Sequence, residues 1–369
     1  MSDLERFELH VSDAVLDDLR DRLGRTRLLD DSPRVPPSGM NAAYLRELVE
    51  SWQAWDWRAR EAWLNSHPQF IAPIDGAQVH FAHLRSAQPD APALLVMHGW
   101  PHTFALQLDF ADRLAEFDVV VASLPGFAFS SPYAEGQLSE PRLAATLHAL
   151  MTEVLGYERY FTYGEDVSAN VSDLIAASYP EHVAGIVATH AHFPTSDERA
   201  ALTDPGELEF FASLAEREWP EGAYGHVQNT RPDVLAAALN DSPVGLLAWI
   251  AEKLVAWSDT PPGDPRLVER RISRERILTE AMIYWVTQSI ASSFRPYYEG
   301  EGDGPIPSTG VPAAVFIQRH EGGYPESLAR RHYLGLRVFD RLEAGGHFAA
   351  AEAPDDLAAR VRSFVAELG

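Results

Sequence analysis

An aspartate, Asp166, lies in the stretch Tyr-Gly-Glu-Asp-Val-Ser-Ala-Asn of residues 163–170, with small residues two positions before and two positions after it. An aromatic run typical of a buried strand precedes it, and apolar residues at helical spacing follow. Strand, sharp turn and helix in this order predict a nucleophile elbow, with Ser168 in place of the second glycine. The positive end of the helix would favour an ionised Asp166. The alternative role for this aspartate is a helix N-cap.

A histidine, His347, lies in the glycine-rich stretch Gly-Gly-His-Phe after the last predicted strand. Hydrolases with the chain order nucleophile, acid, histidine keep their general base there. Glu321 follows the predicted strand 311–318, so we expect it to orient the imidazole of His347 and stabilise its charged form. Glu343 and Asp340 are alternatives, but a side chain so near His347 in sequence would have to fold back on its own loop.

The stretch His-Gly-Trp-Pro of residues 98–101 directly follows a fully apolar strand at 93–97. A turn at the carboxyl end of a central strand is where an α/β sheet presents its backbone to a ligand. The backbone N–H groups of Trp100 and Val167 are therefore the expected oxyanion hole. His98 is expected to pack beneath the loop.

An aspartate nucleophile favours attack on an sp³ carbon that carries a leaving group, followed by hydrolysis of the resulting enzyme ester. The leaving group would be an epoxide oxygen, which needs an acid, or a halide, which needs N–H donors. Tyr224 and Tyr297 are candidate hydroxyl donors, although half-buried packing explains either tyrosine better when its position alone is considered. His190 and His192 form the closest histidine pair, and no flanking carboxylate completes a metal site. We therefore expect neither a metal nor a cofactor.

These residues require a mainly parallel sheet of the α/β class with an inserted helical cap. Strands and helices alternate until about residue 193, give way to mostly helical periodicity, and alternate again near the carboxyl end. The predicted domains are an amino-terminal segment at 1–70, the first part of the core at 71–193, the cap at 194–304 and the second part of the core at 305–369. The amino-terminal segment is expected to begin with a strand at 7–11 and a helix from Ser12.

The amino-acid composition limits the kinds of molecule that this protein is expected to bind. The 369 residues include 54 acidic and 30 basic side chains, a formal net charge of -24, which disfavours nucleic acids and anionic membranes. The chain has no cysteine, shows no signal peptide at residues 1–7 and contains no apolar run of about 20 residues. We expect a soluble cytoplasmic protein that acts on a small molecule and water, with a homodimer left open.

Several longer motifs resemble the microsomal-type epoxide hydrolases of the α/β-hydrolase superfamily. Besides the stretches at 98–101 and 345–348, they are Asp-Trp-Arg at 56–58, Ile-Asp-Gly at 74–76, residues 240–246 and Tyr-Trp at 284–285. The resemblance covers nearly the whole chain and implies a cofactor-independent conversion of epoxides to vicinal diols. It also implies Asp166 as nucleophile, Glu321 as charge-relay acid, and Tyr224 and Tyr297 as epoxide-activating tyrosines.

The chain departs from that family directly after the nucleophile, where the family usually has Trp and Gly and this chain has Val167 and Ser168. A missing aromatic there should enlarge or reshape the pocket. Two alternatives follow from the residues: a dehalogenase that uses the same Asp166 and His347, or a ligand-binding protein on an inactive hydrolase scaffold. The complete set of predicted catalytic residues argues against the second.

Overall fold

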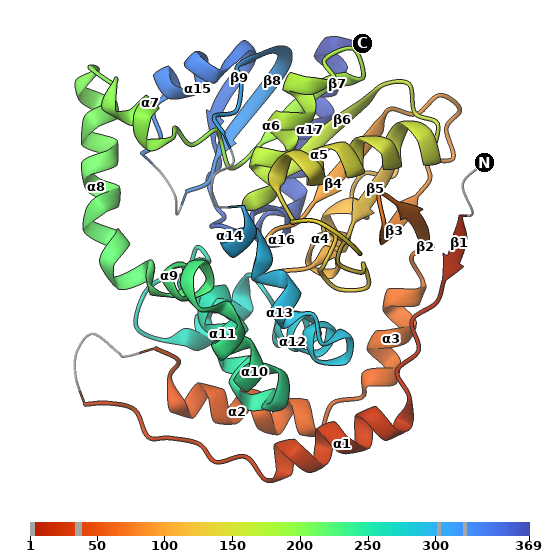
Figure 1. Ribbon diagram of the computed structural model, residues 1–369, viewed down its shortest axis with the longest axis vertical. Helices are drawn as coiled ribbons and strands as arrows, with labels where there is room; N and C mark the ends of the chain where they lie inside the picture. The colour runs from red at the N-terminus through yellow and green to blue at the C-terminus, as the bar shows by residue number, and fades with distance from the viewer. Residues whose placement is uncertain (1–3, 34–38, 301–303, 320–322) are drawn as a thin grey trace.

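The computed structural model describes residues 4–33, 39–300, 304–319 and 323–369, with only the backbone of 217–220 (Figure 1). Among these residues, nine strands form one sheet in the order β1-β2-β3-β5-β4-β6-β7-β8-β9. The strands are β1 (Glu5–Phe7), β2 (Gln69–Ile74), β3 (Ala77–Leu84), β4 (Ala93–Met97), β5 (Asp118–Ala122), β6 (Tyr160–Gly164), β7 (Val183–Ala188), β8 (Thr309–Ile317) and β9 (Tyr333–Arg341).

Strand direction divides the sheet into two parts. Pairing is antiparallel from β1 to β5 and parallel from β5 to β9. In the parallel part, β4 and β6 are neighbours, with Met97 opposite Gly164 at their carboxyl ends. The loops that follow these two strands therefore leave the sheet side by side. This register brings the predicted oxyanion loop to the predicted elbow.

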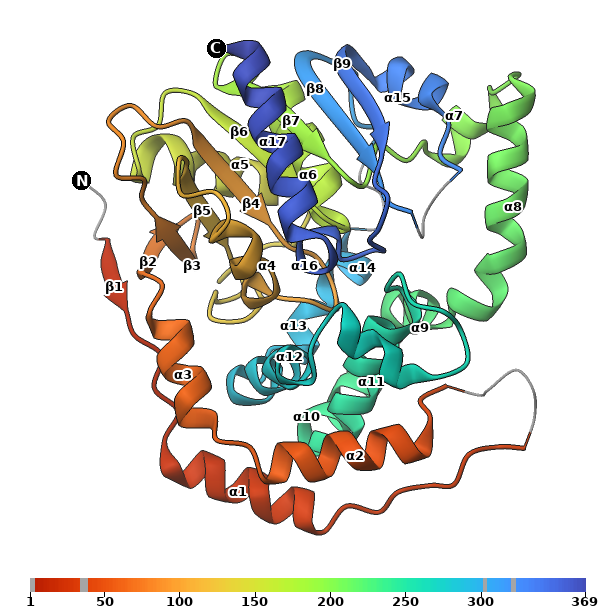
Figure 2. The ribbon, with the colours of Figure 1, turned by 180° about the vertical axis from the view of Figure 1, so that it is seen from behind.

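Helices cover both faces of the sheet (Figures 1 and 2). One face carries α5 and α6, and the opposite face carries α4, α16 and α17. Strands β4 and β5 lie between these layers and are buried along their whole length, as apolar runs in a parallel sheet should be. The expected α/β class is confirmed. The helices are α4 (Phe104–Ala111), α5 (Glu140–Ala149), α6 (Val167–Ser178), α15 (Glu326–His332), α16 (Ala349–Glu352) and α17 (Pro354–Leu368), and a π-helical turn, Leu150–Val154, continues α5.

A helical insertion separates β7 from β8, as the loss of strand periodicity predicts. No single helix in the described ranges is long and apolar enough to cross a membrane; α10 and α11 reach that length only as a pair bent by 118°. The insertion contains α7 (Ser196–Ala200), α8 (Pro205–Glu221), α9 (Ala223–Thr230), α10 (Pro232–Asp241), α11 (Pro243–Ala256), a 3₁₀ turn (Pro265–Arg270), α12 (Arg274–Thr287), α13 (Ile290–Ser293) and α14 (Arg295–Glu299).

The amino-terminal segment begins with β1 at the edge of the sheet, runs along the cap helices and returns to the sheet at β2 (Figure 2). It contains α1 (Asp13–Gly24), α2 (Ala42–Gln53) and α3 (Trp57–Asn65). The predicted start of α1 after Ser12 is confirmed, but the strand predicted at 7–11 is wrong, since β1 ends at Phe7. Leu9 instead exchanges two backbone hydrogen bonds, each 2.8 Å, with the Asn65 side chain. The Asn65 side chain thus satisfies the backbone groups of Leu9 that a neighbouring strand would otherwise pair with.

Candidate active site

Asp166 occupies the turn between β6 and α6, with the uncommon backbone angles φ 55° and ψ -129°. A non-glycine residue with positive φ costs energy and is typical of functional turns. The turn is tight, because a Cβ atom at Gly164 would lie 2.0 Å from the carbonyl oxygen of Ser168. Only glycine fits at that position. This geometry places the Asp166 carboxyl group at the carboxyl edge of the sheet and at the start of a helix.

The oxyanion loop contacts Asp166 directly. The backbone N–H of Trp100 donates to Asp166 Oδ1 at 3.0 Å. A Cβ atom at Gly99 would lie 2.3 Å from Asp166 Cβ, so the close approach of the two loops requires glycine there. The buried hydroxyl of Ser168 donates to the carbonyl oxygen of His98 at 2.5 Å. The serine that departs from the glycine of the elbow pattern therefore links the two loops.

His98 lies beneath this loop, as expected. Its side chain is fully buried, and its Nε2 accepts from the backbone N–H of Leu124 at 3.2 Å. Burial lowers the pKa of His98 to about 3, so the ring is neutral. This histidine holds the loop in place without reaching the cavity described below.

His347 lies on the other side of the Asp166 carboxylate. Its Nε2 is 3.4 Å from Asp166 Oδ2, and its backbone N–H donates to the carbonyl oxygen of Trp257 at 2.9 Å. Burial acts to raise the pKa of Asp166, but His347 and the N–H groups of Val167 and Trp100 outweigh it and lower the pKa to about 2. Asp166 is therefore an anion at neutral pH, which is the form a nucleophile needs.

Glu321, the predicted acid of the triad, lies outside the described residues. The two alternatives, Asp340 and Glu343, are poor partners for His347: Asp340 pairs with Arg360, and Glu343 is exposed. The structure instead places His190 Nε2 3.1 Å from His347 Nδ1. His190 follows β7, so it reaches the same edge of the sheet. No pattern in the sequence predicts its contact with His347.

The two predicted tyrosines meet above the oxyanion loop. Tyr224 on α9 stacks on Trp100 with ring centroids 5.2 Å apart, and Tyr297 on α14 lies edge-on to the same indole at 6.1 Å. Their own ring centroids are 6.0 Å apart. Burial, the Asp166 charge and Tyr224 raise the pKa of Tyr297 well above its usual value. Its hydroxyl therefore keeps its proton and can donate it in a hydrogen bond.

A cavity of 1280 Å³ lies between the sheet and the cap and joins these groups. Asp166, His347, Tyr224 and Tyr297 all border it, and so does Val167. The remaining wall is largely apolar, with Phe193, Phe210, Leu214, Trp257 and Ile317 among its residues. One pocket with a few convergent polar groups is the usual form of a small-molecule site.

A second buried carboxylate, Glu165, supports the site from below. Its Oε1 accepts from the backbone N–H of Ala350 at 2.9 Å and from the hydroxyl of Tyr163 at 2.5 Å, and its Oε2 lies 3.1 Å from His102 Nε2. Burial acts to raise its pKa, but His102 and the other donors lower the pKa to about 2. Glu165 thus connects the elbow, the oxyanion loop and helix α16, which follows His347.

Comparisons with known proteins agree with this geometry. Residues 4–106 match the family described as "Epoxide hydrolase N terminus", and residues 92–285 match "alpha/beta hydrolase fold". Epoxide hydrolase 1 of Oryctolagus cuniculus is 30% identical over 97% of this chain and 88% of its own length. The structure of an Aspergillus niger epoxide hydrolase superposes with a TM-score of 0.83 at 26% identity, covering 99% of this chain and 96% of its own.

The crystal structure of juvenile hormone epoxide hydrolase from Bombyx mori superposes with a TM-score of 0.87, covering all of this chain and 95% of its own. At 24% identity, this likeness supports the fold alone.

Proposed function

The chain belongs to the epoxide hydrolase family of the α/β-hydrolase fold, and we propose that it forms vicinal diols through an ester on Asp166. The observation that carries this proposal is that the two oxygens of that carboxylate have different contacts. Oδ1 receives the N–H of Trp100, while Oδ2 lies 3.4 Å from Nε2 of His347, and both residues border the cavity. One oxygen is held for charge stabilisation, and the other is free to attack.

In the first step, Asp166 Oδ2 attacks an epoxide carbon. A new C–O bond forms as the bond from that carbon to the ring oxygen breaks. The charge that develops on the ring oxygen requires a proton donor, and the hydroxyls of Tyr224 and Tyr297 border the same cavity. A tyrosine that remains protonated at neutral pH can stabilise the charge and then transfer its proton.

In the second step, His347 removes a proton from water, and the hydroxide attacks the Asp166 carboxyl carbon. Negative charge then develops on Oδ1, where the N–H of Trp100 already points, with the N–H of Val167 close by. Collapse of this intermediate breaks the bond between the carboxyl carbon and the oxygen that attacked the substrate, and that oxygen takes the proton from His347 as the diol leaves. The water oxygen stays on the Asp166 carboxylate, and the second proton of the water returns to the tyrosine. Glu321 remains the proposed acid that orients His347.

A single-turnover experiment in H₂¹⁸O tests this route. With enzyme in excess over an aryl epoxide, the account predicts an unlabelled diol and a label in the peptide that contains Asp166. Direct attack of water on the epoxide would instead place ¹⁸O in the diol of the first turnover and leave the peptide unlabelled. Peptide mass spectrometry distinguishes the two results, and a many-turnover reaction, which must label the diol by either route, serves as the control.

A further inference from the structure

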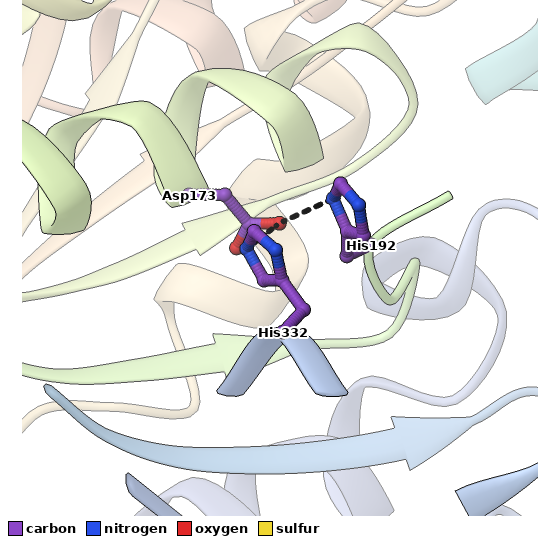
Figure 3. Close-up of side chains that lie close together, drawn as sticks. All are labelled: Asp173, His192 and His332. Atoms are coloured by element: carbon purple, nitrogen blue, oxygen red, sulfur yellow. Dashed lines mark ion pairs between the residues drawn. The ribbon is translucent and has the colours of Figure 1, made fainter. Parts of the chain in front are cut away.

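Three buried side chains from distant parts of the sequence meet at α6, the helix that begins at the elbow (Figure 3). Asp173 lies on α6, His192 on the loop after β7, and His332 at the end of α15. Asp173 is 0% exposed, His192 5% and His332 4%. In the sequence, His192 lies close to His190 but far from Asp173 and His332, so the sequence does not predict this cluster.

The facing atoms are close to one another. His332 Nε2 lies 3.3 Å and His192 Nδ1 3.9 Å from Asp173 Oδ2. One ligand atom from each of the three residues can be chosen so that all lie within 4.8 Å of one another. Figure 3 shows the Asp173 carboxylate beside the two imidazole rings, with the three side chains coming from three separate elements.

Several of these atoms are unsatisfied. Asp173 Oδ1, His192 Nδ1 and His332 Nε2 have no hydrogen-bond partner among the described residues, because even the 3.3 Å contact lacks hydrogen-bond geometry. Burying unpaired polar atoms is costly, and a carboxylate is the costliest of them. Two unpartnered imidazole nitrogens therefore face Asp173 Oδ2, and the other oxygen of that carboxylate is unpartnered as well, which indicates a ligand that accepts lone pairs.

The surroundings prepare the three residues for this role. The hydroxyl of Tyr333 donates to Asp173 Oδ2 at 3.0 Å, which fixes the carboxylate. Glu198 Oε1 lies 3.9 Å from His192 Nε2, where it favours a proton on that nitrogen and a lone pair on Nδ1.

We propose that Asp173, His192 and His332 bind a divalent transition-metal ion, with Zn²⁺ as the ion that best suits two imidazoles and one carboxylate. Zinc takes such ligands at about 2.0–2.1 Å and completes a tetrahedral site with water. The two imidazole rings are stacked, with centroids 3.8 Å apart and planes 6° from parallel. A shared ion lies in both ring planes, so binding rotates His192 out of the stack.

The site differs in place and role from the catalytic one. It would connect α6, which begins at the elbow, to α15 and to the loop after β7. That loop also carries His190, whose Nε2 is 3.1 Å from His347 Nδ1. The bound ion would therefore stabilise the fold and hold the loop beside the catalytic histidine, whichever reaction the cavity performs.

The test uses the full chain after dialysis against a chelator. Zn²⁺ uptake is measured by calorimetry and elemental analysis, and Co²⁺ serves as a probe because tetrahedral Co²⁺ absorbs visible light. We expect one ion per chain, a higher midpoint of thermal unfolding, and loss of more than about tenfold in affinity in Asp173→Asn and His192→Gln. His10→Gln, which removes an exposed histidine, should bind like the unaltered protein.

His347→Gln separates this site from the active site. Binding that survives in Asp173→Asn and His192→Gln but is lost in His347→Gln would overturn the proposal, since the ion would then sit on the catalytic histidine. If the Asp173 and His192 variants fail to fold, His347→Gln decides the question, because loss of binding in that variant would place the ion at the active site. The absence of a saturable Co²⁺ spectrum at one ion per chain would also overturn the proposal.

Discussion

Glu280 allows a quantitative test of how burial shapes this protein. It lies on α12, is 0% exposed, and neither of its carboxylate oxygens has a hydrogen-bond partner among the described residues. Burial raises its pKa from 4.5 to about 8, although the hydroxyl and N–H of Thr103 lie near enough to lower it somewhat. The folded protein thus holds this proton more tightly than the unfolded chain does.

The sign of the linkage follows from this difference. Because the folded state binds more protons, stability falls as the pH rises from about 4.5 and levels off above about 8. At 1.36 kcal/mol per pKa unit, the raised pKa of Glu280 lowers the unfolding free energy by about 2 kcal/mol at pH 6 and by about 5 kcal/mol at pH 9, relative to its value well below pH 4.5. Glu280→Gln keeps the shape of the protonated acid and removes the titration. The unfolding free energy of this variant, relative to that of the unaltered protein, should therefore rise by about 3 kcal/mol between pH 6 and pH 9.

Denaturant unfolding at pH 6 and pH 9 measures this change. Glu275→Gln is the matched control, since Glu275 lies on the same helix with its side chain 53% exposed. An equal gap between Glu280→Gln and the unaltered protein at both pH values would refute the reasoning. A Glu275→Gln variant that reproduced the effect would also refute it.

Three further substitutions test the site. Gly99→Ala places a methyl group 2.3 Å from Asp166 Cβ and should lower kcat/KM by more than about 100-fold, measured with a chromogenic epoxide. Tyr297→Phe should lower kcat/KM by about tenfold or more, with a larger loss when Tyr224 is also replaced, and an unchanged rate would exclude hydroxyl assistance. Ser168→Ala leaves the buried carbonyl of His98 without this donor, so thermal unfolding should show a loss of about 1–2 kcal/mol.

Local motifs suffice to predict the parts of the site that depend on backbone geometry. The elbow at Asp166 and the loop at Gly99 and Trp100 are short segments whose residue types match the turns they must form. Parallel pairing of β4 and β6 then brings both to the same edge. The alternation of strands and helices along the chain, and its interruption by a helical insertion, follow from the change in periodicity.

Two contacts between distant side chains could not be predicted in this way. His190 meets His347, and Glu165 meets His102, because separate loops converge at one edge of the sheet. No spacing in the sequence encodes such a meeting. The strand predicted near Leu9 fails for a related reason, since a distant asparagine takes the hydrogen bonds that a neighbouring strand would have supplied.

The ester on Asp166 is the central claim, and His347→Gln tests it most directly. Glutamine cannot remove the proton from water, so the ester should form and persist. Mixing this variant with a panel of aryl and alkyl epoxides and measuring intact mass and peptide maps should show one substrate added to Asp166, and none in Asp166→Ala. No adduct across the panel, while the unaltered protein forms diols from the same epoxides, would contradict the account.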